Sequence, residues 1–225
     1  KKYKNFNFGL SRNEGFRNPT IYELYGTDNF GYSGNNNLKP EKSISNELYV
    51  KFNLLNNLSG SIRGFKTSIY DQIEYESNKY VNRSDNLDLN QSGINSQIRF
   101  SSSGYNIGLF SSFLSTKKIG GADQLRRPEK TYGFNLNKKF NTSYLDKFDI
   151  NVKYNHYGKH FDTHSSTFVT TSVDSTDIMD LSLSKKIGKY DFHIHATNLF
   201  DEAYQRPHGY SQNGRLFNLG FELNY

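Results

Sequence analysis

The closing stretch of the chain, Arg215–Tyr225, constrains the fold most, because apolar and polar residues alternate through it without a break. The apolar set is Phe217, Leu219, Phe221, Leu223 and Tyr225. A period of two is that of a β-strand with one apolar face, and a strand of about 9–11 residues can cross a bilayer when tilted. A half-buried strand of a soluble sandwich shows the same alternation, so the remainder of the chain must decide between the two.

The composition favours the membrane. Hydrophobic residues make up only 34% of the chain and mean hydropathy is −0.79, yet 16% of residues are aromatic. A soluble core is built mainly from Leu, Val, Ile and Ala, whereas a transmembrane barrel needs apolar residues only at alternate positions and aromatic girdles at both interfaces. The absence of cysteine excludes disulfides and thiolate metal sites. The net charge of +6 is spread without a patch, which argues against nucleic-acid binding.

Ten alternating segments can be traced along the chain, and their connections alternate in length. The predicted strands cover residues 1–10, 48–54, 58–75, up to 100, 105–113, 132–140, 148–154, 181–187, 190–196 and 217–225, with a bulge expected near Gly64 and Phe65. Short turns are expected at Asn56-Asn57, Ser101–Gly104, Asn141–Lys147 and Gly188-Lys189, and long loops at 11–43, 77–85, 116–129, 159–176 and 198–214. This pattern predicts an all-β, transmembrane, antiparallel up-and-down β-barrel in a bacterial outer membrane, with every long loop at one end.

Three motifs carry a family resemblance. Gly15–Tyr25 (GFRNPTIYELY) and Asn37–Ser43 (NLKPEKS) resemble conserved stretches of the TonB-dependent transporters of Gram-negative outer membranes. Asn198–Asp201 (NLFD), followed by Gly209-Tyr210, Gly214-Arg215 and the terminal Tyr225, is similar to the closing signature of that family. The whole chain therefore resembles the carboxy-terminal segment of such a transporter.

The resemblance implies a 22-stranded barrel closed by an amino-terminal plug. Residues 1–225 would be one portion of it, about ten carboxy-terminal strands, with the plug absent from this chain. Contact with the TonB complex would belong to the missing amino-terminal part, and so would any calcium site. The expected partners of the barrel are outer-membrane lipid and lipopolysaccharide, together with the barrel-assembly machinery acting on Tyr225. A transporter of this kind is not an enzyme, so no catalytic residue and no cofactor is expected.

Two further stretches narrow the resemblance. Leu125–Pro128 (LRRP) and Tyr157–Asp162 (YGKHFD) most resemble the cobalamin receptors, which implies a cobalamin-like ligand bound at the outer loops. Arg126 matches a ligand-contacting arginine of those receptors, and His164 stands nearest to a tyrosine contact that this chain lacks. Arg126 and the adjacent Arg127 could donate hydrogen bonds to amide or phosphate oxygens; the alternative is that both are solvated loop charges.

Other interpretations stay open. A siderophore or heme receptor has the same architecture, and a free-standing ten-strand barrel enzyme or adhesin is a rival from another class. Asp162 with His164 could imitate part of a membrane protease site, but no second acidic pair stands at matching loop positions. The aromatic residues of the first long loop either stack on a ligand or pack the loop itself: Tyr22, Tyr25, Phe30 and Tyr32.

The six histidines do not form a metal-binding pattern. His156, His160 and His164 are spaced by four, which aligns side chains only on a helix. His193 and His195 share one strand face, expected to be the lumen. We expect solvated histidines and no metal site.

Overall fold

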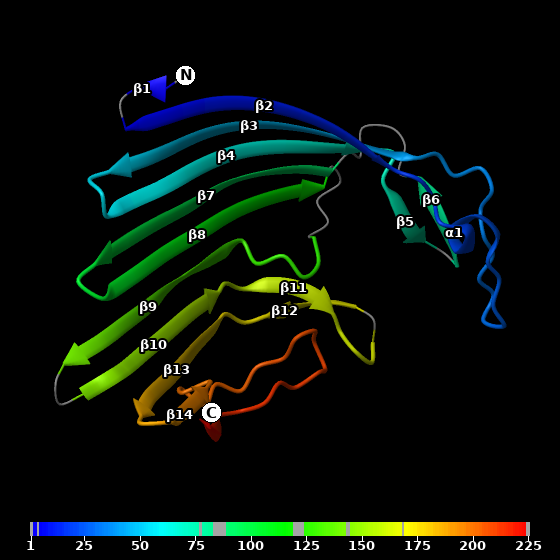
Figure 1. Cartoon of the computed structure of the whole chain (residues 1–225). Coiled ribbons are helices and arrows are strands. Elements are labelled where there is room, and N and C mark those ends of the chain that lie inside the picture. The colour runs from blue at the N-terminus through cyan, green and yellow to red at the C-terminus, as the bar shows by residue number, and fades with distance from the viewer. Residues whose placement is uncertain are drawn as a thin grey trace.

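The main element of the computed structural model is one antiparallel sheet of eleven strands, curved like part of a cylinder wall (Figure 1). The structure describes residues 2–3, 5–76, 78–82, 89–118, 124–142, 145–167 and 169–223, to which every statement below refers. The strand order is β1-β2-β3-β4-β7-β8-β9-β10-β13-β14-β15, so neighbours along the chain are neighbours in the sheet. Two small hairpins, β5–β6 and β11–β12, stand apart from it.

The strands of the large sheet are mostly long, whereas the elements in the loops are short. The large sheet contains β1 Lys2–Tyr3, β2 Phe6–Arg17, β3 Glu41–Leu54, β4 Leu58–Tyr70, β7 Leu89–Ser102, β8 Tyr105–Lys118, β9 Lys130–Thr142, β10 Leu145–Tyr157, β13 Thr176–Ile187, β14 Tyr190–Thr197 and β15 Leu216–Leu223. The loops contain α1 Ile21–Tyr25, β5 Ile73–Glu76, β6 Lys79–Asn82, β11 His160–Thr163 and β12 Thr170–Val173. Within the described ranges, no helix is long and apolar enough to cross a membrane.

One face of the sheet is apolar and uncovered. The register places Leu10 opposite Leu48, Leu48 opposite Gly64, and Gly64 opposite Ile94, so apolar positions of successive strands form rows on one side. The large side chains on that side remain exposed, for example Leu10 at 82% and Leu48 at 54%. We call this side the outward face and the opposite side the lumen face. Such a sheet requires an apolar surrounding, and this fits the barrel wall that the alternation predicts.

The buried apolar residues of the described chain are few and lie almost entirely outside this face. They are Tyr32, Leu38, Ile73 and Ala196. Three of them belong to the loops that follow β2 and β4. A soluble sandwich would instead bury alternate residues of every strand, so the interior of this fold is not a hydrophobic core.

All ten predicted strands are present, but the extents of β2, β3 and β4 differ from the prediction. The third predicted strand, expected over 58–75, ends at Tyr70, and β5, which begins at Ile73, belongs to a separate hairpin. The short β1 is additional, and β2 and β3 continue to Arg17 and Glu41, well into the region predicted as one loop from Ser11 to Ser43. The prediction was wrong there because the backbone pairing of β2 with β3 persists after the apolar alternation has ended. Residues such as Arg12 and Glu14 are strand residues without an apolar face to reveal them.

The bulge predicted near Gly64 and Phe65 is also wrong. The β3–β4 register runs without a shift from Lys42 opposite Tyr70 down to Leu54 opposite Leu58. Phe65 lies on the lumen face, and its ring covers Gly93 so closely that a Cβ there would be 2.9 Å from the ring. Phe65 is apolar but lies on the lumen face, where its ring packs on Gly93 of the next strand. In the sequence it interrupts the alternation of apolar and polar residues in the same way as a bulge would. A register shift does occur between β9 and β10, at Leu145 and Phe148.

The alternation of short turns and long loops is confirmed. Tight turns join β3 to β4, β7 to β8 and β13 to β14, with left-handed φ angles of +78° at Gly104 and +61° at Gly188 that favour glycine. The long connections gather at the other end of the sheet, where α1 and both hairpins stand (Figure 1). The short helix and the hairpins within these loops were not predicted.

This topology gives a direct prediction for orientation. In the full-length protein on intact cells, a peptide tag inserted at Asn35, in a long loop, should be accessible to antibody. Tags at Asn57 or Gly188, in tight turns at the opposite end, should react only after the cells are opened. Surface labelling at Gly188 would contradict the assignment. Gly120, a further predicted surface site, lies outside the described residues.

Candidate functional site at the outer loops

Three of the long connections meet at Asp162, which is completely buried. Its Oδ1 atom accepts hydrogen bonds of 2.7 Å from Nε of Arg126 and 2.7 Å from the backbone N–H of Thr163. Its Oδ2 atom accepts a hydrogen bond of 2.8 Å from the backbone N–H of His208. Arg126 follows β8, Asp162 follows β10 and His208 follows β14. One carboxylate therefore joins three loops that are far apart in the sequence.

The charge on Asp162 is stabilised by this arrangement. Burial alone acts to raise the pKa of the carboxyl group. The hydrogen bonds from His208, Arg126 and Thr163, with the positive charge of Arg126, outweigh burial and hold the pKa below its ordinary value. The carboxylate is therefore ionised at neutral pH, and its hydrogen bonds are of the stronger, charge-assisted kind.

Arg126 is fixed at its backbone and at Nε, while much of its side chain stays in solvent. Its φ is +59°, a left-handed conformation that is uncommon for a residue with a Cβ. Its N–H donates a 2.6 Å hydrogen bond to the carbonyl of Phe161, and the preceding Leu125 forms a parallel bridge with the same residue. The side chain is nevertheless 61% exposed. Such a guanidinium is pre-oriented, because Asp162 holds one edge and leaves the other accessible.

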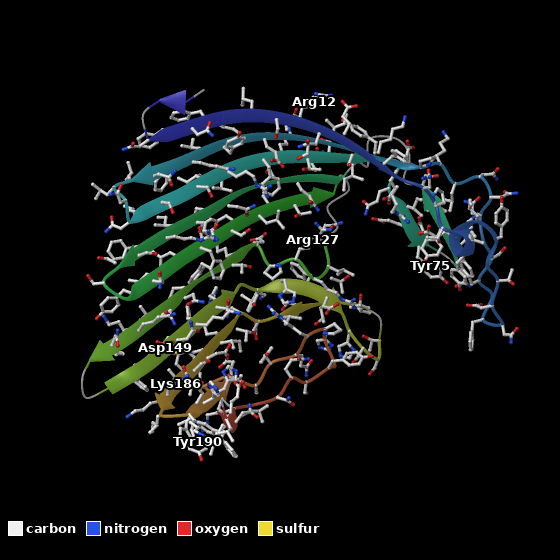
Figure 2. The ribbon with its side chains drawn as sticks, viewed as in Figure 1. Arg12, Tyr75, Arg127, Asp149, Lys186 and Tyr190 are labelled. Carbon is white, nitrogen blue, oxygen red and sulfur yellow. The ribbon has the colours of Figure 1, made fainter. Side chains whose placement is uncertain are left out.

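Arg127 is not part of this cluster. It is exposed, and among the described residues no hydrogen bond or ion pair is found for its side chain. Figure 2 labels it near the hairpin β11–β12. The structure thus gives the two adjacent arginines different surroundings: Arg126 is held by Asp162, and Arg127 is exposed.

His164 lies beside the cluster and contacts a histidine that sequence reasoning missed. Its ring is tilted against that of His208, with 4.7 Å between centroids. Nδ1 of His164 accepts hydrogen bonds of 3.2 Å from the backbone N–H groups of Ser166 and Thr167. No sequence spacing could have paired His164 with His208, because the contact depends on two loops folding over each other.

The same two loops touch at a second point. The guanidinium of Arg206 lies 3.5 Å from the ring centroid of Tyr157, a cation–π contact. Gly209 packs so closely on Ser165 that a Cβ there would approach Ser165 to 2.5 Å. Residues 206–209 of the loop after β14 therefore pack on the end of β10 and on the β10–β13 connection.

The aromatic residues of the first long loop form a cluster of their own. The rings of Tyr22 and Tyr32 are stacked at 4.7 Å, and Tyr32 also contacts Tyr75 and Tyr80 of the hairpin β5–β6 at 6.0 and 5.8 Å. The Tyr32 hydroxyl donates a 2.7 Å hydrogen bond to the carbonyl of Tyr22. This arrangement supports loop packing over ligand stacking for these two residues.

The first two signature motifs anchor this loop to the sheet. Nη1 of Arg17 donates to both carboxylate oxygens of Glu23 at 3.1 Å, and its Nε donates to Glu41 at 2.8 Å. Glu41 also accepts a 2.7 Å hydrogen bond from the N–H of Ile73 at the start of β5. Thr20 and Glu23 form a reciprocal capping box at the start of α1. The motif residues therefore serve the architecture of the loop.

The closing motif has a similar anchoring role at the last loop. The N–H of Asn198 donates to Asp180 at 3.0 Å, and its side-chain oxygen accepts from the N–H of Glu202 at 3.0 Å. Asp201 accepts a 2.7 Å hydrogen bond from the N–H of Arg215, at the entry to β15. The two ends of the loop are thereby tied to each other and to β13.

Two of the other histidines, His156 and His195, make ordinary contacts within the sheet. His156 stacks on Tyr132 at 4.4 Å and lies 2.7 Å from the carboxylate of Asp177. His195 lies 2.7 Å from the hydroxyl of Ser182. Within the described part of the chain, no group of three or more potential ligands could hold a metal ion.

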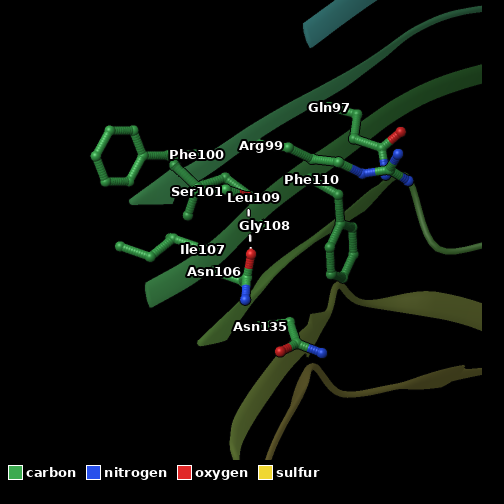
Figure 3. Close-up of a pocket in the computed structure, with 10 residues that line it drawn as sticks. All are labelled: Gln97, Arg99, Phe100, Ser101, Asn106, Ile107, Gly108, Leu109, Phe110 and Asn135. Carbon is green, nitrogen blue, oxygen red and sulfur yellow. Dashed lines mark hydrogen bonds between the residues drawn. The ribbon is translucent and has the colours of Figure 1, made fainter. Parts of the chain in front are cut away.

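A depression of about 410 Å³ lies elsewhere, near the tight turn between β7 and β8 (Figure 3). Gln97 and Arg99 project to one side of the strands, whereas Phe100 and Ile107 project to the other (Figure 3). Ser101 donates a 2.8 Å hydrogen bond to the adjacent strand across this region. The depression is far from the cluster at Asp162, at the opposite end of the strands.

Comparison with known proteins adds a family and a fold. The family described as "TonB dependent receptor-like, beta-barrel" matches residues 4–224. The pyoverdine outer-membrane receptor FpvA of Pseudomonas aeruginosa PAO1 is similar with a TM-score of 0.80 at 14% identity, over 100% of this chain and 34% of that chain. The FrpB iron transporter of Neisseria meningitidis gives a TM-score of 0.74 at 13% identity, covering 98% and 37%. The ferric-catecholate import receptor Fiu of Escherichia coli K12 gives 0.73 at 16%, covering 99% and 33%. The chain spans about a third of the length of these structures.

Proposed function

The chain belongs to the TonB-dependent receptor β-barrel family, and from this premise we propose that residues 1–225 form the carboxy-terminal portion of a receptor that imports a scarce, large nutrient. It is a segment of an outer-membrane β-barrel, and the family consists of receptors and transporters. The proposed cycle is capture of the ligand at the outer loops, followed by energised passage through the barrel. The TonB complex would act through the part of the protein that precedes this chain.

The observation that carries the proposal is the cluster at Asp162. Three loops are held together there, and Arg126 is presented with its guanidinium partly free. A receptor requires outer loops whose polar groups are pre-oriented, because ordering them at the moment of binding reduces affinity. We propose Arg126 as a ligand contact, with His164 and Arg127 as secondary candidates.

Two ligand classes have specific support. Cobalamin is the first, because LRRP at Leu125–Pro128 and the stretch Tyr157–Asp162 are similar to the corresponding parts of cobalamin receptors. A ferric siderophore is the second, because the similar solved structures include an iron transporter, a pyoverdine receptor and a ferric-catecholate receptor. Both ligands are large and rich in amide, phosphate or carboxylate oxygens, which arginine can bind.

The two ligands can be separated by uptake. The full-length receptor would be expressed in a strain that lacks its own receptors, and entry of radiolabelled cobalamin and of radiolabelled ferric pyoverdine would be measured. We expect TonB-dependent uptake of cobalamin. Uptake of ferric pyoverdine alone would contradict the cobalamin assignment and support a siderophore receptor. Uptake of neither, by a receptor shown to be folded and surface-exposed, would contradict both.

The difference between the two arginines is a testable consequence. Arg126→Ala should weaken binding of the imported ligand by about 1–3 kcal/mol, the usual contribution of a hydrogen bond to a charged group. Arg127→Ala should have a smaller effect, because Arg127 is not held by a partner. Equilibrium binding to the purified full-length receptor measures both. If both variants bind the ligand as tightly as the wild type, neither arginine contacts the ligand and both are solvated loop charges.

Two proposed partners concern other parts of the surface. Tyr225 is proposed as a signal for the barrel-assembly machinery, and it lies outside the described residues. Outer-membrane lipid and lipopolysaccharide are proposed to surround the outward face, for which the exposed apolar rows give support.

A further inference from the structure

The depression near the β7–β8 turn opens on the lumen face, at the end of the strands opposite the cluster at Asp162. Ile98 belongs to the outward face, so Gln97 and Arg99 on either side of it belong to the lumen face. Figure 3 shows both side chains, with Phe110, on one side of the strands. In the proposed orientation the tight turns face the periplasm, so the depression lies near the exit of the barrel.

Two glycines give the depression its shape. Gly108 lies directly opposite Arg99, and a Cβ built at Gly108 would meet no atom within 4 Å, so the floor is open. The ring of Phe110 covers Gly133 of β9 so closely that a Cβ there would be 2.8 Å from it. Phe110 is thereby held against the sheet as one wall. The volume of about 410 Å³ is that of a small-ligand pocket, which suits one arm of a large nutrient.

Arg99 carries a positive charge that its neighbours do not balance. Its side chain is exposed, and no hydrogen bond or ion pair is found for it within the described part of the chain. Ser59 and Gly108 lie opposite it on the two adjacent strands, and Gln97 and Ser101 are its nearest lumen-face neighbours on β7. None of these four residues is a carboxylate. Arg99 also lines a second depression, of about 530 Å³, toward β3 and β4, so its guanidinium is accessible from two sides.

Amide side chains add hydrogen-bond donors beside this guanidinium. The side-chain oxygen of Asn106 accepts a 2.8 Å hydrogen bond from Ser101, and that of Asn135 accepts a 3.2 Å hydrogen bond from Asn151. Both amides are held through their oxygen atoms, which leaves their NH₂ groups to donate. The depression therefore combines a free cation and amide donors with an aromatic wall. This set of groups suits a carboxylate or phosphate attached to an apolar or planar body.

We propose that this depression is an exit-side subsite, which binds a carboxylate- or phosphate-bearing arm of the imported nutrient after it has left the outer loops. Arg99 binds the anionic group, Asn106 and Asn135 donate to its oxygen atoms, and Phe110 packs against the adjoining apolar part. The inference rests on the proposed function, because it presupposes a nutrient that passes through the barrel. Arg126 and Arg99 offer the same chemistry at the two ends of the strands, so a group released by the first can be bound by the second.

The test compares capture with uptake by the full-length receptor on cells. Radiolabelled cobalamin and radiolabelled ferric pyoverdine are the probes; binding is measured in a strain without TonB and uptake in an energised strain. Arg99→Gln should bind the imported probe within about twofold of the wild type, because the outer loops are unchanged, and should import it about tenfold more slowly, the scale of a lost charge-assisted hydrogen bond. Gly108→Leu, which fills the floor but keeps Arg99, should separate capture from uptake in the same way.

Two control variants separate loss of the anion contact from a general defect of the lumen wall. Gly220→Leu fills another lumen-face glycine whose Cβ position is free of atoms within 4 Å, and it should import the probe at the wild-type rate. Arg99→Lys keeps the positive charge and should recover most of the uptake. Heat-modifiable mobility of each variant reports the folded amount, to which the uptake rates are normalised.

The outcomes distinguish the subsite from the proposed function. Wild-type uptake by Arg99→Gln, or an equal loss of capture and uptake, would overturn the subsite and leave the proposed function standing. Sensitivity of the Arg99→Gln cells to vancomycin, a large antibiotic that an intact outer membrane excludes, would also overturn it, because Arg99 would then hold the barrel closed. If the folded, surface-exposed wild type imports neither probe, the proposed function is contradicted and the subsite with it.

Discussion

Replacing Asp162 with alanine should release three outer loops from one another while leaving the barrel wall intact. The change removes the acceptor for Arg126 Nε and for the N–H groups of Thr163 and His208. A donor left without an acceptor costs about 1–3 kcal/mol where it is buried, which corresponds to roughly one to two orders of magnitude in local opening. Hydrogen-exchange mass spectrometry of the full-length receptor should therefore show faster exchange in the segments around Arg126, Thr163 and His208 together. The affinity for the ligand should also decrease in this variant, because the Arg126 side chain is no longer held in one orientation.

The control and the pH dependence make this prediction specific. Asp174→Ala removes an exposed carboxylate from the same β10–β13 connection and should change nothing. The pKa of Asp162 is lowered in the folded protein, so its contribution is fully present above about pH 4, the ordinary value of an aspartate, and is lost as pH falls through the lowered pKa. Loop protection in the wild type should be constant between pH 5 and 7 and should decline only below pH 4. Unchanged exchange in Asp162→Ala would show that the loops are held by their other contacts.

The strands of the barrel wall could be predicted from the sequence because contact with lipid selects an apolar residue at every second position. Lipid on one side and polar contacts on the other impose an alternation that survives in Phe217, Leu219 and Phe221 without any knowledge of their neighbours. The predicted strand limits and the predicted bulge were wrong at positions where the residues do not follow this alternation. Beyond Leu10 the strand β2 continues on backbone pairing alone, and Phe65 faces the lumen because Gly93 gives its ring a place to lie.

The candidate site could be predicted only in part, because its contacts are long-range. A local motif points to Arg126, but its partner Asp162 lies 36 residues further along the chain. The third member of the cluster, His208, lies another 46 residues beyond Asp162. The sequence offers Asp162 as the end of the YGKHFD stretch and as a possible protease residue, whereas in the structure its carboxylate joins three loops. Burial of a charged residue is the feature that identifies it, and burial in a loop cannot be inferred from one sequence.

The signature motifs show why a family resemblance can be strong while function stays open. Arg17, Glu23 and Glu41 anchor the first loop, and Asn198 and Asp201 fasten the last. These residues position loops in any receptor of this architecture, whatever the ligand. The residues that would distinguish cobalamin from a siderophore lie between such anchors, where one sequence offers the least constraint.

The largest effect of all is expected on the closing strand, where Phe221→Arg should prevent normal assembly of the full-length receptor. The register places Phe221 opposite Phe192 and Leu219 opposite Ile194, so β15 continues the apolar outward face of β14. Phe221 is 73% exposed in the sheet and would meet lipid there. A charge on the lipid side costs about 2–4 kcal/mol at the middle of the membrane and less toward the interfaces. The Phe221→Arg variant also loses the burial of an aromatic ring in lipid.

Two matched variants separate charge from position and from loss of the ring. Glu222→Gln changes the adjacent residue, which the register pairs with Asp191 on the lumen face, and it should be nearly silent because polar residues are tolerated there. Phe221→Leu keeps the site apolar and should cost about 1 kcal/mol, the scale of a modest apolar replacement. Heat-modifiable electrophoretic mobility of outer-membrane fractions reports the folded amount, which should be near normal for both and strongly reduced for Phe221→Arg. Normal assembly of Phe221→Arg together with a defect in Glu222→Gln would mean that Phe221 faces the lumen and Glu222 faces lipid, the reverse of the orientation inferred from the register.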